Sequence, residues 1–157
     1  MNTQAVSHPM DELVYQAVFG DDGQKQTARF SIWQQAIAAE IIPASIHDFY
    51  LAKGDGRVPK DLTVPAMNIR GMAYDTARAA FEAAKKHHVG ALIFEIARSE
   101  IGYTDQRPEE YVIVMMAAAL REGWSGPLFV QGDHFQSKAA TPGVPKSGEI
   151  ETIKDLI

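Results

Sequence analysis

Apolar residues recur at helical spacing through the first third of the chain. The pattern predicts three helices, over residues 11–19, 26–42 and 45–54. Pro43 ends the second helix, whose apolar stripe is the strongest and consists of Phe30, Trp33, Ile37 and Ile41. Ser45 and Asp48 predict a capping box at the start of the third. Residues 1–60 are therefore expected to form a helical lead-in.

From about residue 61 the pattern changes to short apolar runs that alternate with helical segments. The runs predict strands over 62–69, over 91–97 and within 126–135. The helices that follow them are expected over 75–88, 108–123 and 148–157, the last capped by Ser147. Strand and helix alternating at intervals of about thirty residues indicate βαβ crossovers in a parallel α/β sheet.

The turn after the first of these strands helps to choose among the parallel folds. It reads Asn-Ile-Arg-Gly-Met-Ala over 68–73 and lacks the three glycines of a dinucleotide-binding fingerprint, and no phosphate-binding Walker loop occurs. These absences favour a TIM (β/α)8 barrel, in which polar residues stand at strand ends. A whole barrel needs roughly 200 residues or more, so 61–157 is expected to be the first three units of a longer, truncated barrel.

Composition and charge exclude several classes of protein. The 157 residues are 46% hydrophobic and 22% charged, which is typical of a globular protein with one core. A net charge of -5 and scattered basic residues argue against nucleic acid and anionic membrane surfaces as partners. The chain has no cysteine, no leader-like start and no apolar run long enough for a membrane span. We expect a cytoplasmic protein.

The stretch from 126 to 135 brings an acid and an imidazole to the end of a buried strand. Gly126-Pro127 begins the apolar run, and Gly132-Asp133-His134 ends it. In parallel sheets the carboxyl ends of the strands are where chemistry is done. Strand interiors rarely contain Gly, Asp and His together unless the backbone approaches a ligand closely. The alternative is a strand that simply runs into a polar loop.

Two segments resemble a known family of enzymes. The segment 64–69, Val-Pro-Ala-Met-Asn-Ile, resembles the first barrel strand of class II, zinc-dependent ketose-bisphosphate aldolases, and 132–134 resembles their third-strand Asp-His pair. The order and spacing of the two segments agree with the family. The lead-in is longer than in familiar members, and Glu95 and Ala97 stand where many members have glutamine and serine.

The resemblance implies cleavage of a phosphosugar, a ketose bisphosphate, to dihydroxyacetone phosphate and an aldehyde. By the family pattern His134 is a zinc ligand, and Asp133 exchanges a proton with the oxygen that becomes the aldehyde. Asn68 would hydrogen-bond substrate or the enediolate oxygens. Arg70 and Arg98 follow the first two strands, where they either meet the anionic substrate or are solvated surface charges.

Two further questions stay open at this stage. Glu95 is either a substrate-binding or supporting residue, or a buried carboxylate satisfied by a neighbouring arginine or backbone amide. A catalytic zinc needs three protein ligands. The other histidines, His8, His47, His87 and His88, lie in the lead-in or at the opposite edge of the sheet. The remaining ligands are therefore expected outside this chain, which alone should be a poor catalyst.

Three classes of function remain. The first is the aldolase-type lyase, expected to be a homo-oligomer at full length. The second is a non-catalytic relative that serves as a subunit or binding protein. The third is a barrel enzyme that uses Asp133 and His134 without metal.

Overall fold

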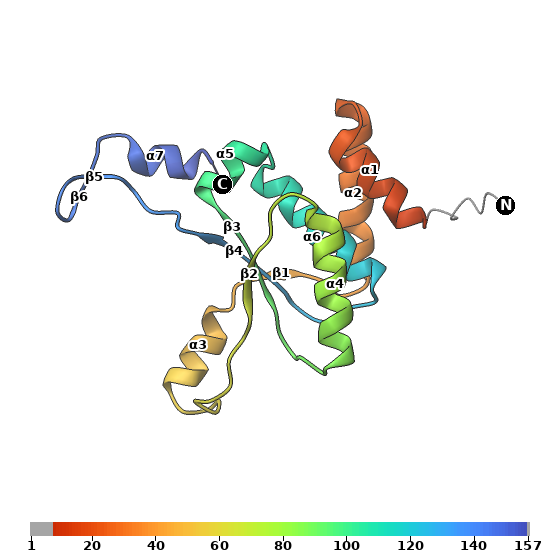
Figure 1. The fold of residues 1–157 in the computed structure, drawn as a ribbon, viewed down its shortest axis with the longest axis horizontal. Coiled ribbons are helices and arrows are strands. Elements are labelled where there is room, and N and C mark those ends of the chain that lie inside the picture. Colours follow the sequence, from red (N-terminus) through yellow and green to blue (C-terminus); the bar gives the residue numbers. More distant parts are fainter. Residues whose placement is uncertain (1–7, 157) are drawn as a thin grey trace.

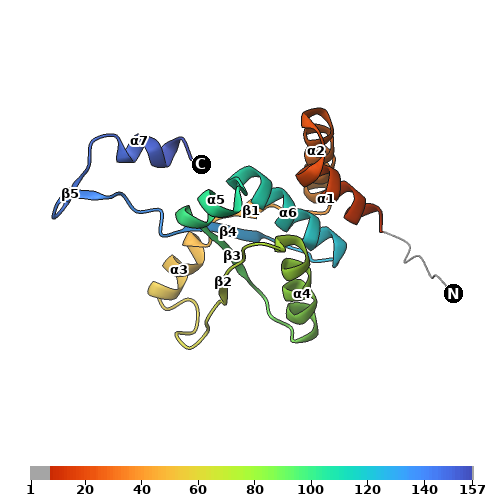
Figure 2. The ribbon, with the colours of Figure 1, turned by 45° about the horizontal axis from the view of Figure 1, so that its top comes forward.

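The computed structural model describes residues 8–156, which form an α/β structure with a parallel sheet (Figures 1 and 2). The helices are α1 (Pro9–Phe19), α2 (Asp22–Ala38), α3 (His47–Gly54), α4 (Ala73–Lys86), α5 (Arg98–Thr104), α6 (Pro108–Arg121) and α7 (Glu149–Lys154). The strands are β1 (Pro43–Ala44), β2 (Ala66–Asn68), β3 (Ile93–Ala97), β4 (Leu128–Asp133), β5 (Ala139–Thr141) and β6 (Val144–Pro145). The predicted parallel α/β class is confirmed.

The main sheet has the order β1-β4-β3-β2, and every pair in it is parallel. Strands β2, β3 and β4 are the three predicted strands, placed side by side in chain order. The fourth strand, β1, comes from the lead-in, where no strand was predicted, and pairs Pro43 with Leu128 and Ala44 with Phe129. Strand β1 therefore covers the outer edge of β4 along its first two residues. A separate antiparallel pair, β5 and β6, follows β4.

Helices α4 and α6 cover one face of the sheet, and the main hydrophobic core lies between them and that face. Phe94 of β3 is fully buried, and its ring lies 5.0 Å from that of Phe81 in α4. Leu128 and Val130 of β4 join the same core. Because successive side chains of a strand point to opposite faces, Glu95 and Gln131 belong to the other face. Helix α3, which has no buried residue, lies across β2 from α4 (Figures 1 and 2).

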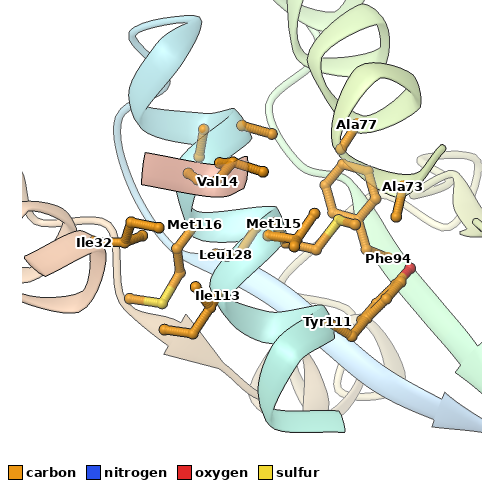
Figure 3. Close-up of a cluster of buried hydrophobic side chains, with 14 of the residues drawn as sticks. Val14, Ile32, Ala73, Ala77, Phe94, Tyr111, Ile113, Met115, Met116 and Leu128 are labelled. Atoms are coloured by element: carbon orange, nitrogen blue, oxygen red, sulfur yellow. The ribbon is translucent and has the colours of Figure 1, made fainter. Parts of the chain in front are cut away.

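Helix α6 links the lead-in to the sheet through one hydrophobic core. Its residues from Tyr111 to Ala119, apart from the half-buried Val112, are buried, and α1, α2, α4, β3 and β4 all contact the helix. Figure 3 shows Ile32 of α2 beside Met116 of α6. The same core therefore extends across the predicted boundary at residue 60.

Of the apolar stripe predicted over residues 26–42, Ile41 is buried in this core, but Phe30, Trp33 and Ile37 do not face it. Phe30 and Trp33 are 61% and 42% exposed, and Ile37 is 39% exposed. The buried residues of α2 are instead Ala28, Ile32 and Ala36. Small side chains let two helix backbones approach closely, so an alanine-rich face suits the contact with α1 and α6 better than bulky rings do.

Two predicted helix caps are wrong. The N-cap of α3 is Ile46, and the Ser45 hydroxyl accepts a hydrogen bond from the His47 amide at 3.2 Å. Ser45 thus lies one residue too early for a capping box. Helix α7 follows Gly148, whose φ of 79° is left-handed, and no side chain caps it.

Helix α5 lies between the predicted strand 91–97 and the predicted helix 108–123, where no helix was expected. At its start the Glu100 carboxylate accepts a hydrogen bond from the Ala97 amide at 2.8 Å.

The helices among residues 8–156 are too short or too polar to cross a bilayer.

Replacing one buried residue of the lead-in should destabilise the whole protein. We expect Ile32→Ala to lower the free energy of unfolding by about 2–5 kcal/mol, because Ile32 is fully buried in the shared core. Ile37→Ala in the same helix removes a partly exposed side chain and should cost less than about 1 kcal/mol. Urea unfolding, followed by circular dichroism and tryptophan fluorescence, should give one coincident transition. Two transitions, with only one moved by Ile32→Ala, would contradict a shared core.

Candidate functional site

The predicted polar residues meet at the edge formed by the carboxyl ends of β2, β3 and β4. Asn68 ends β2 and Asp133 ends β4, with β3 between them. The Asn68 Nδ2 donates a hydrogen bond to Asp133 Oδ2 at 2.7 Å. The register places Asn68 level with Glu95 and Asp133 level with Ala97. The bond therefore joins the two strands that flank β3.

Asp133 and His134 form a close pair in which the acid is the more sheltered partner. The Asp133 side chain is 27% exposed and the His134 side chain 73%. The distance from His134 Nε2 to Asp133 Oδ1 is 3.4 Å. The backbone of His134 has a φ of 52°, a left-handed conformation that non-glycine residues rarely adopt. The chain turns at this residue and leaves the imidazole at the surface.

Gly132 is required by the close approach of a ring. A Cβ built on Gly132 would lie 2.5 Å from Cδ2 of Phe135, well inside van der Waals contact. The Phe135 ring folds back over the strand and packs against the core. Gly132, Val130 and Phe135 line a cavity of about 290 Å³ with Ile96 and Tyr111. The glycine before the Asp-His pair therefore sets the turn that presents the pair.

A second carboxylate–carboxamide contact lies on the same face of the sheet. Gln131 of β4 donates through Nε2 to the Glu95 carboxylate of β3. The Glu95 carboxylate is thus satisfied by an amide side chain, rather than by the arginine or backbone amide considered above. Sequence reasoning missed Gln131, although it stands two residues before Asp133 and strand alternation puts both on one face. The Tyr111 hydroxyl fixes the same point of β3 by donating to the Glu95 carbonyl at 2.7 Å.

Arg70 and Arg98, which follow β2 and β3, are both engaged in ion pairs within the protein. We call the loops and helix starts that follow the carboxyl ends of the strands the rim. Arg98 Nη1 lies 2.9 Å from Glu149 Oε2, and Arg70 pairs with Glu100. The Glu100 side chain is only 3% exposed, and the structure reveals it as a buried acid that the sequence interpretation passed over. The Arg98 side chain is 23% exposed, whereas that of Arg70 is 54% exposed and remains open to solvent on one side of its ion pair. The hydrogen bond from Arg98 is the main cause that holds the pKa of Glu149 below its ordinary value.

The residues at this edge do not by themselves complete a metal site. Within 8–156, no group of three or more His, Asp or Glu side chains is arranged to hold a metal ion. His87 and His88 close α4, whose start follows the carboxyl end of β2, so they lie toward the opposite edge of the sheet. His47 begins α3. His134 is the imidazole that the structure brings to the Asp133 edge.

A second, larger cavity of about 620 Å³ lies outside the cluster of Asn68, Asp133 and His134. Its walls come from α1, from the start of α4, and from residues 104–114. The Tyr74 hydroxyl donates to Asp11 Oδ1 at 2.7 Å beside it. Burial and this hydrogen bond raise the pKa of Tyr74 well above its usual range. Asn68, Asp133 and His134 do not line this cavity.

Comparison with known proteins gives no match to a family model, a curated protein or a solved structure. The resemblance to class II aldolases therefore rests on the two segments 64–69 and 132–134 and on their meeting in space.

We expect Gly132→Ala to disturb the turn before Asp133. The added methyl must displace the Phe135 ring, which should lower the free energy of unfolding by about 1–3 kcal/mol. Combining it with Phe135→Ala should cost less than the sum of the two single changes, because the clash is then removed. Thermal or urea denaturation of the four proteins measures this coupling.

Gly102→Ala is a matched control for that cycle. Gly102 lies in α5, and a Cβ there would meet no atom within 4 Å. Alanine at this position should leave stability unchanged or raise it by about 0.5–1 kcal/mol. Equal losses for Gly132→Ala and Gly102→Ala would mean that the Phe135 contact does not set the turn.

Proposed function

We propose that the edge carrying Asn68, Asp133 and His134 serves a zinc-dependent aldol lyase that acts on ketose bisphosphates. One observation carries the proposal. The two segments that resemble the aldolase family, whose key residues are 65 positions apart in the chain, are joined by the 2.7 Å hydrogen bond from Asn68 to Asp133. Residues that contribute to one reaction must lie within a few ångströms of each other, and these do.

In the proposed reaction, Asp133 exchanges a proton with the substrate oxygen that becomes the aldehyde. A carboxylate that accepts a hydrogen bond from a side-chain amide is held in one orientation. The Asn68 amide supplies that bond to Oδ2, which leaves Oδ1 on the side of His134. General acid-base catalysis of this kind contributes typically 10²- to 10⁴-fold to the rate.

Glu95 and Gln131 supply the next polar pair along the same face. Their contact joins β3 to β4 one step below Asp133 in the strand register. Hydroxyl groups of a sugar phosphate need both donors and acceptors, and a carboxylate beside a carboxamide offers both. We assign this pair to substrate hydroxyl recognition, with Glu95 as the acceptor.

Zinc is the cofactor that this function requires, and His134 is the one ligand that we assign to it. Histidine nitrogen is a common zinc ligand, and the exposed imidazole at the end of β4 is open to a metal ion. A catalytic zinc takes three protein ligands, so the others must come from outside residues 8–156. When bound, the ion would polarise the ketone carbonyl as a Lewis acid. We further propose a cytoplasmic homo-oligomer.

Asp133→Asn tests the proton transfer. The amide keeps the shape of the side chain and an oxygen for Asn68, but it cannot exchange the proton. We expect cleavage of ketose bisphosphates by the intact protein to fall about 100-fold or more, with zinc content unchanged. Asp55→Asn is the control, since Asp55 is an exposed residue whose carboxylate pairs with Arg57. Wild-type turnover in Asp133→Asn would exclude Asp133 as the acid-base group.

His134→Ala tests the metal assignment. Losing one of three protein ligands should lower the zinc that remains after dialysis by about tenfold or more, as measured by elemental analysis. His87→Ala, at the far end of α4, should retain the wild-type zinc content. Equal zinc in both variants would show that His134 is not a ligand. Turnover that survives complete zinc removal would favour the metal-independent barrel enzyme instead.

A further inference from the structure

The chain after the Asp-His pair is held to the rest of the protein mainly by polar contacts. We call residues 136–156, which include β5, β6 and α7, the strap. Every residue of β5 is exposed, and α7 has no buried residue. Figure 1 shows the β5–β6 hairpin reaching away from the main sheet before the chain returns through α7 toward α5. Leu156 packs against the edge of the core at the end of the strap.

The polar contacts of the strap converge on Arg98 and Glu149. Arg98 Nη1 donates to Glu149 Oε2 at 2.9 Å and to the Gln136 carbonyl at 3.3 Å. The Lys138 backbone amide donates to the same Glu149 oxygen at 3.2 Å. A more distant contact, from Arg107 to the Asp155 carbonyl, measures 3.5 Å. Both side chains of the central pair are largely buried, with exposures of 23% for Arg98 and 14% for Glu149.

This arrangement has the chemistry of an oxyanion-binding site. A guanidinium and a backbone amide both donate to one carboxylate oxygen, and the same two donors suit a phosphate oxygen. Both donors help to hold the pKa of Glu149 below its ordinary value, so the occupant is an anion at neutral pH. Glu149 belongs to a six-residue helix that has little burial to hold it in place.

Arg98 also lies close enough to the Asp133 edge of the sheet to contact a ligand bound at the proposed site. It directly follows β3, at the edge where Asp133 ends the neighbouring β4. Its contact with Gln136 reaches the loop that begins at His134. An anion bound by Arg98 would therefore lie beside the polar edge and act on the strap at the same time.

We propose that Arg98 and the Lys138 amide form a phosphate site in which the Glu149 carboxylate is the internal occupant, and that a phosphate group displaces Glu149 and releases α7. The choice of phosphate rests on the proposed function, because ketose bisphosphates carry that group. Glu149 is then an autoinhibitory occupant, and Arg98 contacts the substrate only in the released state.

Hydrogen–deuterium exchange of the full chain tests the release. We compare saturating inorganic phosphate with chloride at equal ionic strength. Phosphate should speed exchange of the α7 amides about 5-fold, because a six-residue helix without tertiary contacts is only marginally stable. Glycerol 3-phosphate, a phosphate monoester, should act in the same way. The amides of α2, which lie outside the strap, serve as the internal reference.

Glu149→Gln tests the competition. Without the internal carboxylate, phosphate should bind about 5-fold more tightly by calorimetry, and α7 should exchange rapidly even in chloride. The matched control is Glu151→Gln, since Glu151 lies in the same helix and its carboxylate pairs with Lys154. Arg98→Gln should abolish phosphate binding and leave α7 in rapid exchange.

Either of two results overturns the proposal. One is exchange of α7 in the wild-type protein that phosphate does not change, and the other is phosphate affinity that is equal in Glu149→Gln and Glu151→Gln. These readouts do not use turnover. A protein that releases α7 with phosphate but cleaves no ketose bisphosphate would refute the proposed function and retain the anion site.

Discussion

Burial of helix α6 is the constraint on which the rest of the structure depends. A helix that is apolar on nearly all sides must be covered all round, because exposing its residues to water costs about 1.5–3 kcal/mol for each large side chain. The sheet and α4 cover one side of α6, and α1 and α2 cover the other. The lead-in is thus part of the core, and β1 adds it to the sheet through the first residues of β4.

The same burial gives the sheet two unlike faces. Phe94, Leu128 and Val130 turn toward α4 and α6, and the alternate positions near the carboxyl ends of the strands hold polar residues. Those positions hold the contacts of Asn68 with Asp133 and of Gln131 with Glu95. The polar array is therefore a consequence of strand alternation beside a well-packed core. Its side chains are linked to one another across three strands, which orients them without any help from a ligand.

Buried or half-buried acids organise the rim around this array. Glu100 ties the start of α5 to Arg70, and Glu149 ties the strap to Arg98. Both acids lie beyond strand ends, where a loop without hydrogen-bonding partners would otherwise be free to move. The arginines that could meet an anionic substrate are thus also the residues that hold the rim together. At the proposed phosphate site, binding of an anion would therefore be linked to movement of α7.

Periodicity in the sequence determined the main helices and the three central strands, because side-chain spacing follows directly from helix and strand geometry. It also placed Asn68 and Asp133 at strand ends. Only the tertiary structure decided that Ala28 and Ile32, rather than Phe30 and Trp33, face the core, since helix contacts depend on how closely two backbones approach. The pairing of Pro43 with Leu128 and of Arg98 with Glu149 joins distant parts of the chain, and local spacing carries no signal for such contacts.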